Sequence, residues 1–115
     1  MASKRSRIEL RDFEIEAIGL LVGSTLSNEE LVQVLDEGSV TELKETGYGY
    51  FLTLAHPGLS QERLVCDKPV VSGRHDHLRC GFVVFIEDRE LTLECYPLFG
   101  DPLPNGFRLQ PVEIY

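Results

Sequence analysis

Residues 78–96, LRCGFVVFIEDRELTLECY, decide the fold of this chain. Residues 78–86 are apolar on both sides of an alternating pattern through their middle, which is typical of a central strand covered on at least part of both faces. Residues 87–90, EDRE, form a charged stretch that predicts a hairpin turn. Residues 91–95 then alternate again, with apolar side chains on one face and polar ones on the other. The stretch therefore predicts an antiparallel hairpin within a sheet.

Further strand patterns flank this hairpin in the sequence. Residues 40–45 predict one strand, and residues 48–54 predict a second that carries Tyr48 and Tyr50 on one face. Residues 63–66 predict a short strand that continues past a kink into residues 69–72, and a turn follows at residues 73–77. Residues 97–106 hold three prolines and two glycines and predict an ordered loop, and residues 112–115 predict a final strand.

The N-terminal part of the chain carries a helical pattern. Residues 12–22 place apolar side chains at helical spacing, and Gly23 ends the segment. A strand over residues 13–18 is the alternative, because Glu14 and Glu16 alternate there with apolar residues. We favour the helix.

A second helix has clearer boundaries. Ser27 and Glu30 have the spacing of a capping box, in which each residue satisfies a backbone N–H of the other. Apolar residues within 31–35 form one stripe, and Gly38 predicts a left-handed stop. The pattern predicts a helix over residues 28–37, close enough to the first helix to form a helix pair.

Helices followed by a run of strands indicate the α+β class. We predict an N-terminal helix pair packed on one face of a mostly antiparallel sheet of four to six strands. Residues 8–115 are expected to form this single α+β domain, and residues 1–7, MASKRSR, are expected to be a flexible basic tail.

Charge and composition limit the classes of function. The chain has 115 residues and a formal net charge of −8, and residues 8–115 alone reach −11, because all of the 19 acidic residues but only 8 of the basic ones lie there. Nucleic-acid binding normally requires a surplus of Lys and Arg, so we expect no nucleic-acid partner. No apolar stretch approaches the length of a membrane span or a signal peptide, so we expect a cytosolic protein without a membrane partner.

The cysteines and histidines suggest one metal-binding alternative. Cys66, Cys80 and Cys95 form no Cys-x-x-Cys pair and lie in apolar contexts, so we expect free core cysteines. His75 and His77 have the spacing of two ligands on one side of a strand, but a zinc site needs at least three ligands. Metal binding at His75 and His77 with Cys80 or Cys66 is therefore kept as an alternative, and our main prediction is no metal and no cofactor.

The chain lacks a recognisable catalytic set. Glu94 and Cys95 are adjacent in a strand and point to opposite faces, and burial suppresses the reactivity of a thiol such as that of Cys80. The sequence contains no Gly-x-Ser-x-Gly motif of a nucleophile elbow. The glycines of residues 46–51 do not form a phosphate-binding loop, because neither a helix nor a lysine follows them. We predict that the protein is not an enzyme.

Acidic and aromatic residues mark a candidate surface for a protein partner. Tyrosines on an open sheet face make good interface anchors, although packing of the pair in the core is the alternative reading. Acidic residues gather at the 87–90 turn and on the outward face beyond it, where charge complementarity attracts a basic partner. The predicted partner-binding residues are Tyr48, Tyr50, Glu87, Asp88, Glu90 and Glu94.

One resemblance covers roughly residues 46–115. The stretches GYGYF (47–51), GFVVFIEDRELTLECY (81–96) and PNGFR (104–108) resemble small bacterial proteins, some of which look like immunity proteins of contact-dependent or polymorphic toxin systems. The resemblance implies a protein that neutralises a toxin, and it assigns no site residues. We therefore expect a non-enzymatic, cytosolic protein-binding module, an immunity protein for a basic toxin in its most concrete form. A metal-binding protein and a homodimer that pairs through its sheet are the alternatives.

Overall fold

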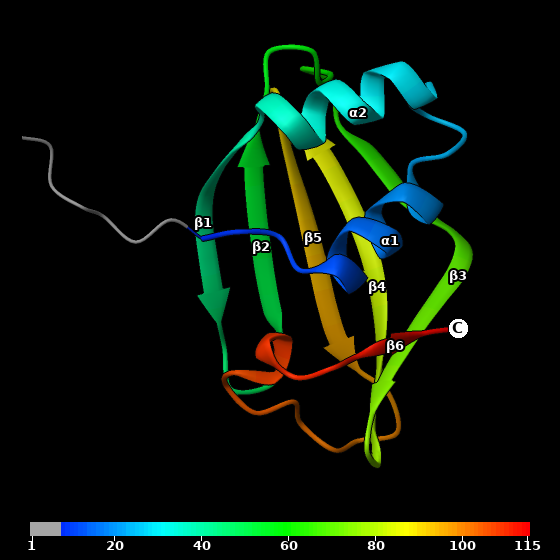
Figure 1. Cartoon of the computed structure of the whole chain (residues 1–115), viewed down its shortest axis with the longest axis vertical. Helices are drawn as coiled ribbons and strands as arrows, with labels where there is room; N and C mark the ends of the chain where they lie inside the picture. The colour runs from blue at the N-terminus through cyan, green and yellow to red at the C-terminus, as the bar shows by residue number, and fades with distance from the viewer. Residues whose placement is uncertain (1–7) are drawn as a thin grey trace, which may run out of the picture.

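The computed structural model describes residues 8–115, so the predicted basic tail lies outside the described residues. Two helices precede the strands, α1 (Asp12–Leu21) and α2 (Asn28–Glu37), and the predicted helix pair and α+β class are confirmed (Figure 1). The later elements are β1 (Ser39–Glu45), β2 (Tyr50–Ala55), β3 (Leu64–His75), β4 (Leu78–Glu87), β5 (Glu90–Pro97), the 3₁₀ helix η1 (Phe107–Leu109) and β6 (Glu113–Ile114).

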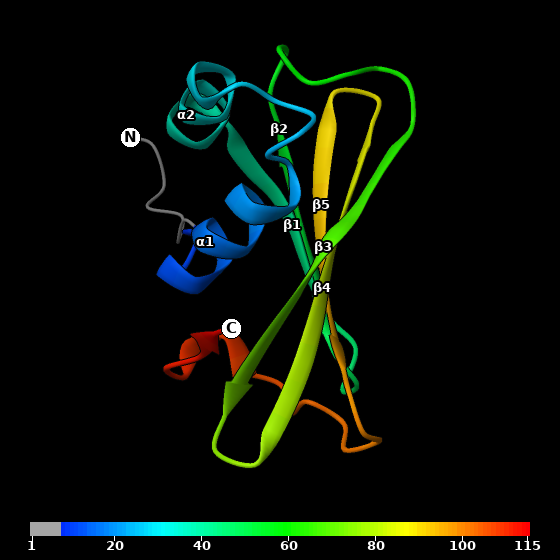
Figure 2. The same ribbon diagram turned by 90° about the vertical axis from the view of Figure 1, so that its right-hand side faces the viewer.

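The six strands form one open antiparallel sheet in the order β1-β2-β5-β4-β3-β6. The predicted hairpin, β4 and β5, lies at its centre. Both helices lie on the same side of the sheet, and within residues 8–115 no helix covers the other side (Figure 2). The central strand was expected to be covered on at least part of both faces; on the side without helices, Val83 and Phe85 are only partly buried.

The core lies between the sheet and the helices. Leu52, Leu93 and Val84 are neighbours across three strands, and each is at most 1% exposed. Ala17 and Ile18 of α1 are fully buried against this side of the sheet. Burial of each large apolar side chain contributes about 1.5–3 kcal/mol, so this layer holds the helices and sheet together.

The helix ends follow the sequence pattern with one correction. The backbone N–H of Glu30 donates to Ser27 Oγ at 3.1 Å, and that of Ser27 donates to Glu30 Oε1 at 2.8 Å, which confirms the capping box. Gly38 has φ −67°, so the predicted left-handed stop is wrong. Glycine fits there for another reason: a Cβ atom would collide with the carbonyl oxygen of Val34.

The strand β3 continues past a kink as predicted, but it extends further than the pattern indicated. From Leu64 on, the segments 63–66 and 69–72 fall in this one strand, whose register is irregular between Cys66 and Val71. The predicted turn at 73–77 shortens to Asp76 and His77, because residues 73–75 still pair with β4.

The start of β2 shifts in the same way. Thr46 Oγ1 accepts hydrogen bonds from the backbone N–H groups of Tyr48 and Gly49, at 3.2 and 3.1 Å. These bonds close a turn before the sheet begins, so β2 starts at Tyr50 and Tyr48 lies outside it.

Candidate functional site

The side of the sheet without helices is the candidate site. We call it the open face and define it by the outward side chains of the three central strands: Phe51, Thr53, Val83, Phe85, Thr92 and Glu94. Phe51 pairs with Glu94, which pairs in turn with Val83. Two aromatic rings and one carboxylate therefore share a surface that is neither fully buried nor fully solvated.

The turn between β4 and β5 closes the upper end of the open face. Asp88 and Arg89 have φ of 55° and 65°, as a two-residue turn of the primed type requires, although neither residue is glycine. Arg89 Nη1 donates to the carbonyl oxygens of Pro57 and Leu59, at 3.1 and 2.9 Å. The backbone N–H of Asp88 donates to the carbonyl oxygen of Gln61, and that of Arg89 donates to the carbonyl oxygen of Ser60. The turn is therefore held against the loop that follows β2.

That loop has its own anchor. His56 Nδ1 accepts a hydrogen bond from the Gly58 N–H at 2.9 Å, so the proton of the neutral ring is on Nε2, which lies 2.8 Å from Glu37 Oε1. His56 is only 8% exposed. It connects the end of α2 to the loop, and through the loop to the turn. Nothing in the sequence near His56, apart from the strand-ending Pro57 and Gly58, signals this role.

A depression of about 300 Å³ lies where the open face meets the turn. On one wall, the Arg63 guanidinium lies 5.3 Å from the centre of the Phe85 ring, and its Nη1 is 3.2 Å from Glu87 Oε1. Within residues 8–115, the carboxylates of Asp88 and Glu90 have no ion-pair partner. The lining residues are Phe51, Arg63, Phe85, Glu87, Asp88, Glu90 and Thr92.

The structure places four of the six residues predicted to bind a partner on the open face or at its β4–β5 end, and three of them lie together. Glu87, Asp88 and Glu90 line the depression, and Glu94 lies on the open face. Tyr48 is 57% exposed but belongs to the turn before β2, at the end of the strand away from the depression.

The prediction that Tyr50 contacts a partner is wrong. Tyr50 is 2% exposed and lies in the core, as the alternative reading of the tyrosine pair had it. The two tyrosines differ because the strand begins between them, so their alternating spacing does not place them on a common surface.

Glu94 has an electrostatic property that can be tested. Partial burial raises the pKa of its carboxyl, so the folded protein holds this proton more tightly than the unfolded chain does. The ionised form therefore opposes folding at neutral pH, and this penalty disappears as the pH falls below about 4.

We expect Glu94→Gln to raise the free energy of unfolding at pH 7, by less than about 1 kcal/mol because solvent still screens the carboxylate. Urea denaturation at pH 7 and pH 3.5 measures the difference between variant and parent. It should shrink at the lower pH, and a difference that grows as the pH falls would contradict the assignment.

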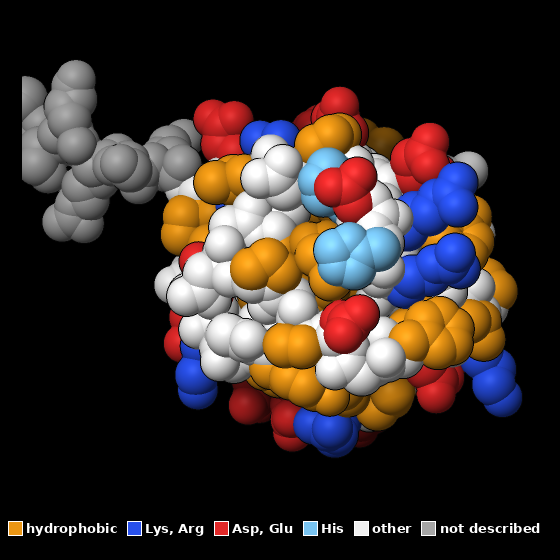
Figure 3. Space-filling view, turned by 90° about the horizontal axis from the view of Figure 1, so that it is seen from below, with side chains coloured by type: hydrophobic (Ala, Val, Ile, Leu, Met, Phe, Trp, Pro, Cys, Tyr) orange, Lys and Arg blue, Asp and Glu red, His pale blue; other side chains and the backbone are white. Residues whose placement is uncertain are grey.

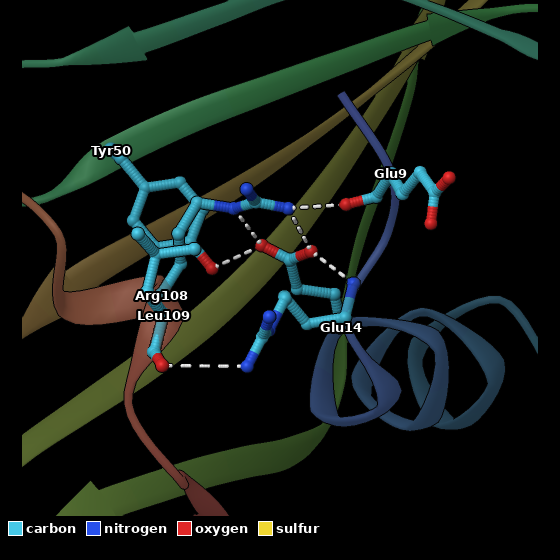
Figure 4. A network of polar contacts seen from close by, with 6 residues as sticks. Glu9, Glu14, Tyr50, Arg108 and Leu109 are labelled. Carbon is cyan, nitrogen blue, oxygen red and sulfur yellow. Dashed lines mark hydrogen bonds and ion pairs between the residues drawn. The ribbon is translucent and has the colours of Figure 1, made fainter. Parts of the chain in front are cut away.

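A second polar cluster lies inside the protein (Figure 4). Glu14 of α1 is fully buried and accepts hydrogen bonds from Tyr50 Oη at 2.6 Å, from Arg108 Nε at 2.8 Å and from Arg108 Nη2 at 2.7 Å. The backbone N–H of Arg11 donates to the same carboxylate, and Arg108 also donates to the carbonyl oxygen of Glu9. We call Glu14, Tyr50 and Arg108 the buried cluster.

The buried cluster holds its charges and protons firmly. Hydrogen bonding to Glu14 raises the pKa of Arg108, so the guanidinium stays charged. Burial first, and then the Glu14 charge, raise the pKa of the Tyr50 hydroxyl, which therefore stays protonated and donates. Glu14 is 0% exposed, so no ligand reaches its carboxylate. The buried cluster joins α1, β2 and η1 and has a structural role.

The histidines and cysteines do not converge. Seen from below, histidine side chains lie at the surface beside Lys or Arg side chains (Figure 3). His75 Nδ1 lies 3.2 Å from the carbonyl oxygen of Pro111, whereas Cys80 is fully buried on the helix-covered side. Within residues 8–115, no group of three His, Cys, Asp or Glu side chains is arranged to hold a metal ion.

The three cysteines are free and buried, as expected from the sequence. Burial raises the pKa of the Cys95 thiol, which disfavours the reactive thiolate. Among the described residues, no helix is long and apolar enough to span a membrane.

A larger depression, of about 610 Å³, lies at the other side of the molecule between residues 8–10, the end of α2 and the start of β1. Ile15, Leu35 and Val40 are among its lining residues. None of the predicted partner-binding residues lines it, and its polar lining residues are Glu9, Asp36 and Ser39.

Comparisons with protein-family models, with curated proteins and with solved structures find no match for this chain.

Proposed function

We propose that the protein is a non-enzymatic protein-binding module and that its open face, with the acidic β4–β5 turn, binds a basic protein partner. One observation carries the proposal: Phe51 and Phe85 are partly exposed beside Glu87, Asp88 and Glu90, on the side of the sheet without helices. Aromatic side chains at the centre of a patch and charges around it are the usual anatomy of a protein interface.

Electrostatics and rigidity both support this reading. Residues 8–115 carry a net charge of −11, which speeds encounter with a positively charged partner. The turn is anchored by Arg89 to the carbonyl oxygens of Pro57 and Leu59, so binding does not have to order it. A surface already in its binding conformation loses less entropy on association.

The most concrete form of the proposal is an immunity protein of the cytosol. In that form, the open face docks on the basic substrate cleft of a toxin and excludes the substrate. The sequence resemblance of residues 46–115 to immunity proteins of toxin systems motivates this form. A toxin-like gene beside the gene for this chain is the result expected, and a neighbourhood without one argues against the toxin form but leaves the binding module in place.

The binding module is tested with the purified full chain and two matched pairs of substitutions. Glu87→Gln with Glu90→Gln removes two charges at the depression, whereas Glu16→Gln with Glu29→Gln removes two exposed charges on the helices. Proteins captured from the source cells are identified, and the purified partner is titrated calorimetrically against each double variant.

We expect the partner to be basic and the first double variant to bind it at least about 10-fold more weakly, a change of about 1.4 kcal/mol. The second double variant, Glu16→Gln with Glu29→Gln, should bind with an affinity within about 2-fold of the parent. An equal loss of affinity in both double variants, or no loss of affinity in the first, would contradict the assignment of the open face. A homodimer seen by sedimentation velocity that dissociates only in the first double variant would replace the foreign partner with a second copy.

A further inference from the structure

We propose that the depression beside the β4–β5 turn is a binding site for an arginine side chain of the partner. The inference rests on the proposed function, because it names the group that the open face accepts. It identifies a guanidinium, held between an aromatic ring and carboxylates, as the chemical centre of the interaction.

The protein's own Arg63 demonstrates this chemistry on one wall of the depression. Its guanidinium carbon lies 5.3 Å from the centre of the Phe85 ring, within the range of a cation–π contact. Its Nη1 lies 3.2 Å from Glu87 Oε1, so the same cation also pairs with a carboxylate. One wall therefore already holds a guanidinium between a ring and an acid.

The opposite wall offers the same two kinds of group without a cation between them. Phe51 and Thr92 form the floor there, and Phe51 is partly exposed. Glu90 and Asp88 stand at the rim, both exposed, and within residues 8–115 neither has an ion-pair partner. Phe51 pairs across the strands with Glu94, and Glu90 lies four residues from Glu94 along β5 on the same face. A second guanidinium that enters the depression therefore meets an aromatic ring and a carboxylate among the lining residues, the same two kinds of group that Arg63 contacts.

The arrangement selects arginine over lysine. A guanidinium is planar, stacks on an aromatic ring and donates two parallel hydrogen bonds to a carboxylate. A guanidinium is also less strongly hydrated than an ammonium group, so it loses less hydration free energy on entering a partly apolar depression. Lysine provides the same charge without the stacking, so charge alone does not predict the preference.

The test uses the full chain labelled with ¹⁵N and two uncharged-ended tripeptides, acetyl-Gly-Arg-Gly-amide and acetyl-Gly-Lys-Gly-amide. Amide shifts are followed by NMR during titration with each peptide. We expect the arginine peptide to bind in the millimolar range and to shift the amides of the depression: Phe51, Phe85, Asp88, Glu90 and Thr92. The lysine peptide should bind at least about 5-fold more weakly.

Three single variants separate this site from general attraction to an acidic protein. Phe51→Leu keeps an apolar side chain but removes the ring, and Glu90→Gln removes the rim charge. Each should weaken the arginine peptide at least about 3-fold. Glu16→Gln removes the same charge from the far side of the molecule and should change its affinity less than 1.5-fold. The amide spectrum of each variant outside the depression reports whether it is folded.

Two results would overturn the arginine site: equal affinity for the two peptides, or shifts spread over acidic residues on both sides of the molecule. Either result leaves the proposed function standing if the identified partner still binds through the open face. Conversely, preferential binding of the arginine peptide at the depression supports the site even where capture from cells finds no partner. The two proposals therefore fail separately.

Discussion

Replacing Arg108 with Met is expected to lower the free energy of unfolding by about 3–5 kcal/mol, since loss of one partner leaves a buried charge without compensation. Glu14 is 0% exposed and receives two of its four hydrogen bonds from Arg108. Without the guanidinium, the fully buried Glu14 carboxylate loses two hydrogen bonds and the cation that compensates it, which favours the unfolded chain.

Urea denaturation followed by circular dichroism measures this effect, and Arg79→Met provides the matched control. Arg79 is exposed, and its loss should change the free energy of unfolding by less than about 0.5 kcal/mol. The double substitution Glu14→Gln with Arg108→Met removes both charges and should recover part of the loss. Equal stability of Arg108→Met and Arg79→Met would show that the buried cluster does not hold α1 to the sheet.

Gly49→Ala is expected to destabilise the protein by about 2–3 kcal/mol, the upper part of the range for a group forced into a filled space. A Cβ atom at this position would collide with the carbonyl oxygen of Cys95. That oxygen belongs to the backbone of β5, a central strand, so it cannot move aside as a flexible side chain would. The strands β2 and β5 would have to separate where Tyr50 pairs with Cys95.

Gly47→Ala tests the same turn for a different effect. Gly47 has φ +79° and open space around it, so alanine there meets backbone strain but no collision. We expect a loss of about 1 kcal/mol. Thermal denaturation of both variants gives the comparison, and a Gly47→Ala variant less stable than Gly49→Ala would contradict the geometry of close approach.

Local patterns predicted most of the elements of this fold. The alternation in residues 78–96 identified the central hairpin, and the spacing of Ser27 and Glu30 identified the start of α2, because neighbours in sequence determine both features. The candidate site was partly predictable for the same reason. Glu87, Asp88 and Glu90 share one turn, so their proximity follows from the hairpin alone.

Features that depend on distant residues were not predictable in this way. Glu14 follows the polar spacing of Glu16, and nothing near it in sequence indicates that Arg108 makes its burial possible. The partial exposure of Phe51 and Phe85 was also not predicted. A strand with apolar side chains on both faces does not indicate which face lacks a covering helix. The depression arises from three strands and a loop, so no single stretch of sequence contains it.

The buried cluster also determines the order in which the chain can complete its structure during synthesis. Glu14 and Arg108 are 94 residues apart, so the carboxylate is made long before its cation. At about 5–20 residues per second, translation takes roughly 5–20 s to cover that distance. Throughout this interval α1 has no partner for its one buried charge. A nascent chain that stops before residue 108 therefore lacks both the cation that pairs with Glu14 and the last strand, β6, so we expect the final docking of α1 to be a late event in synthesis.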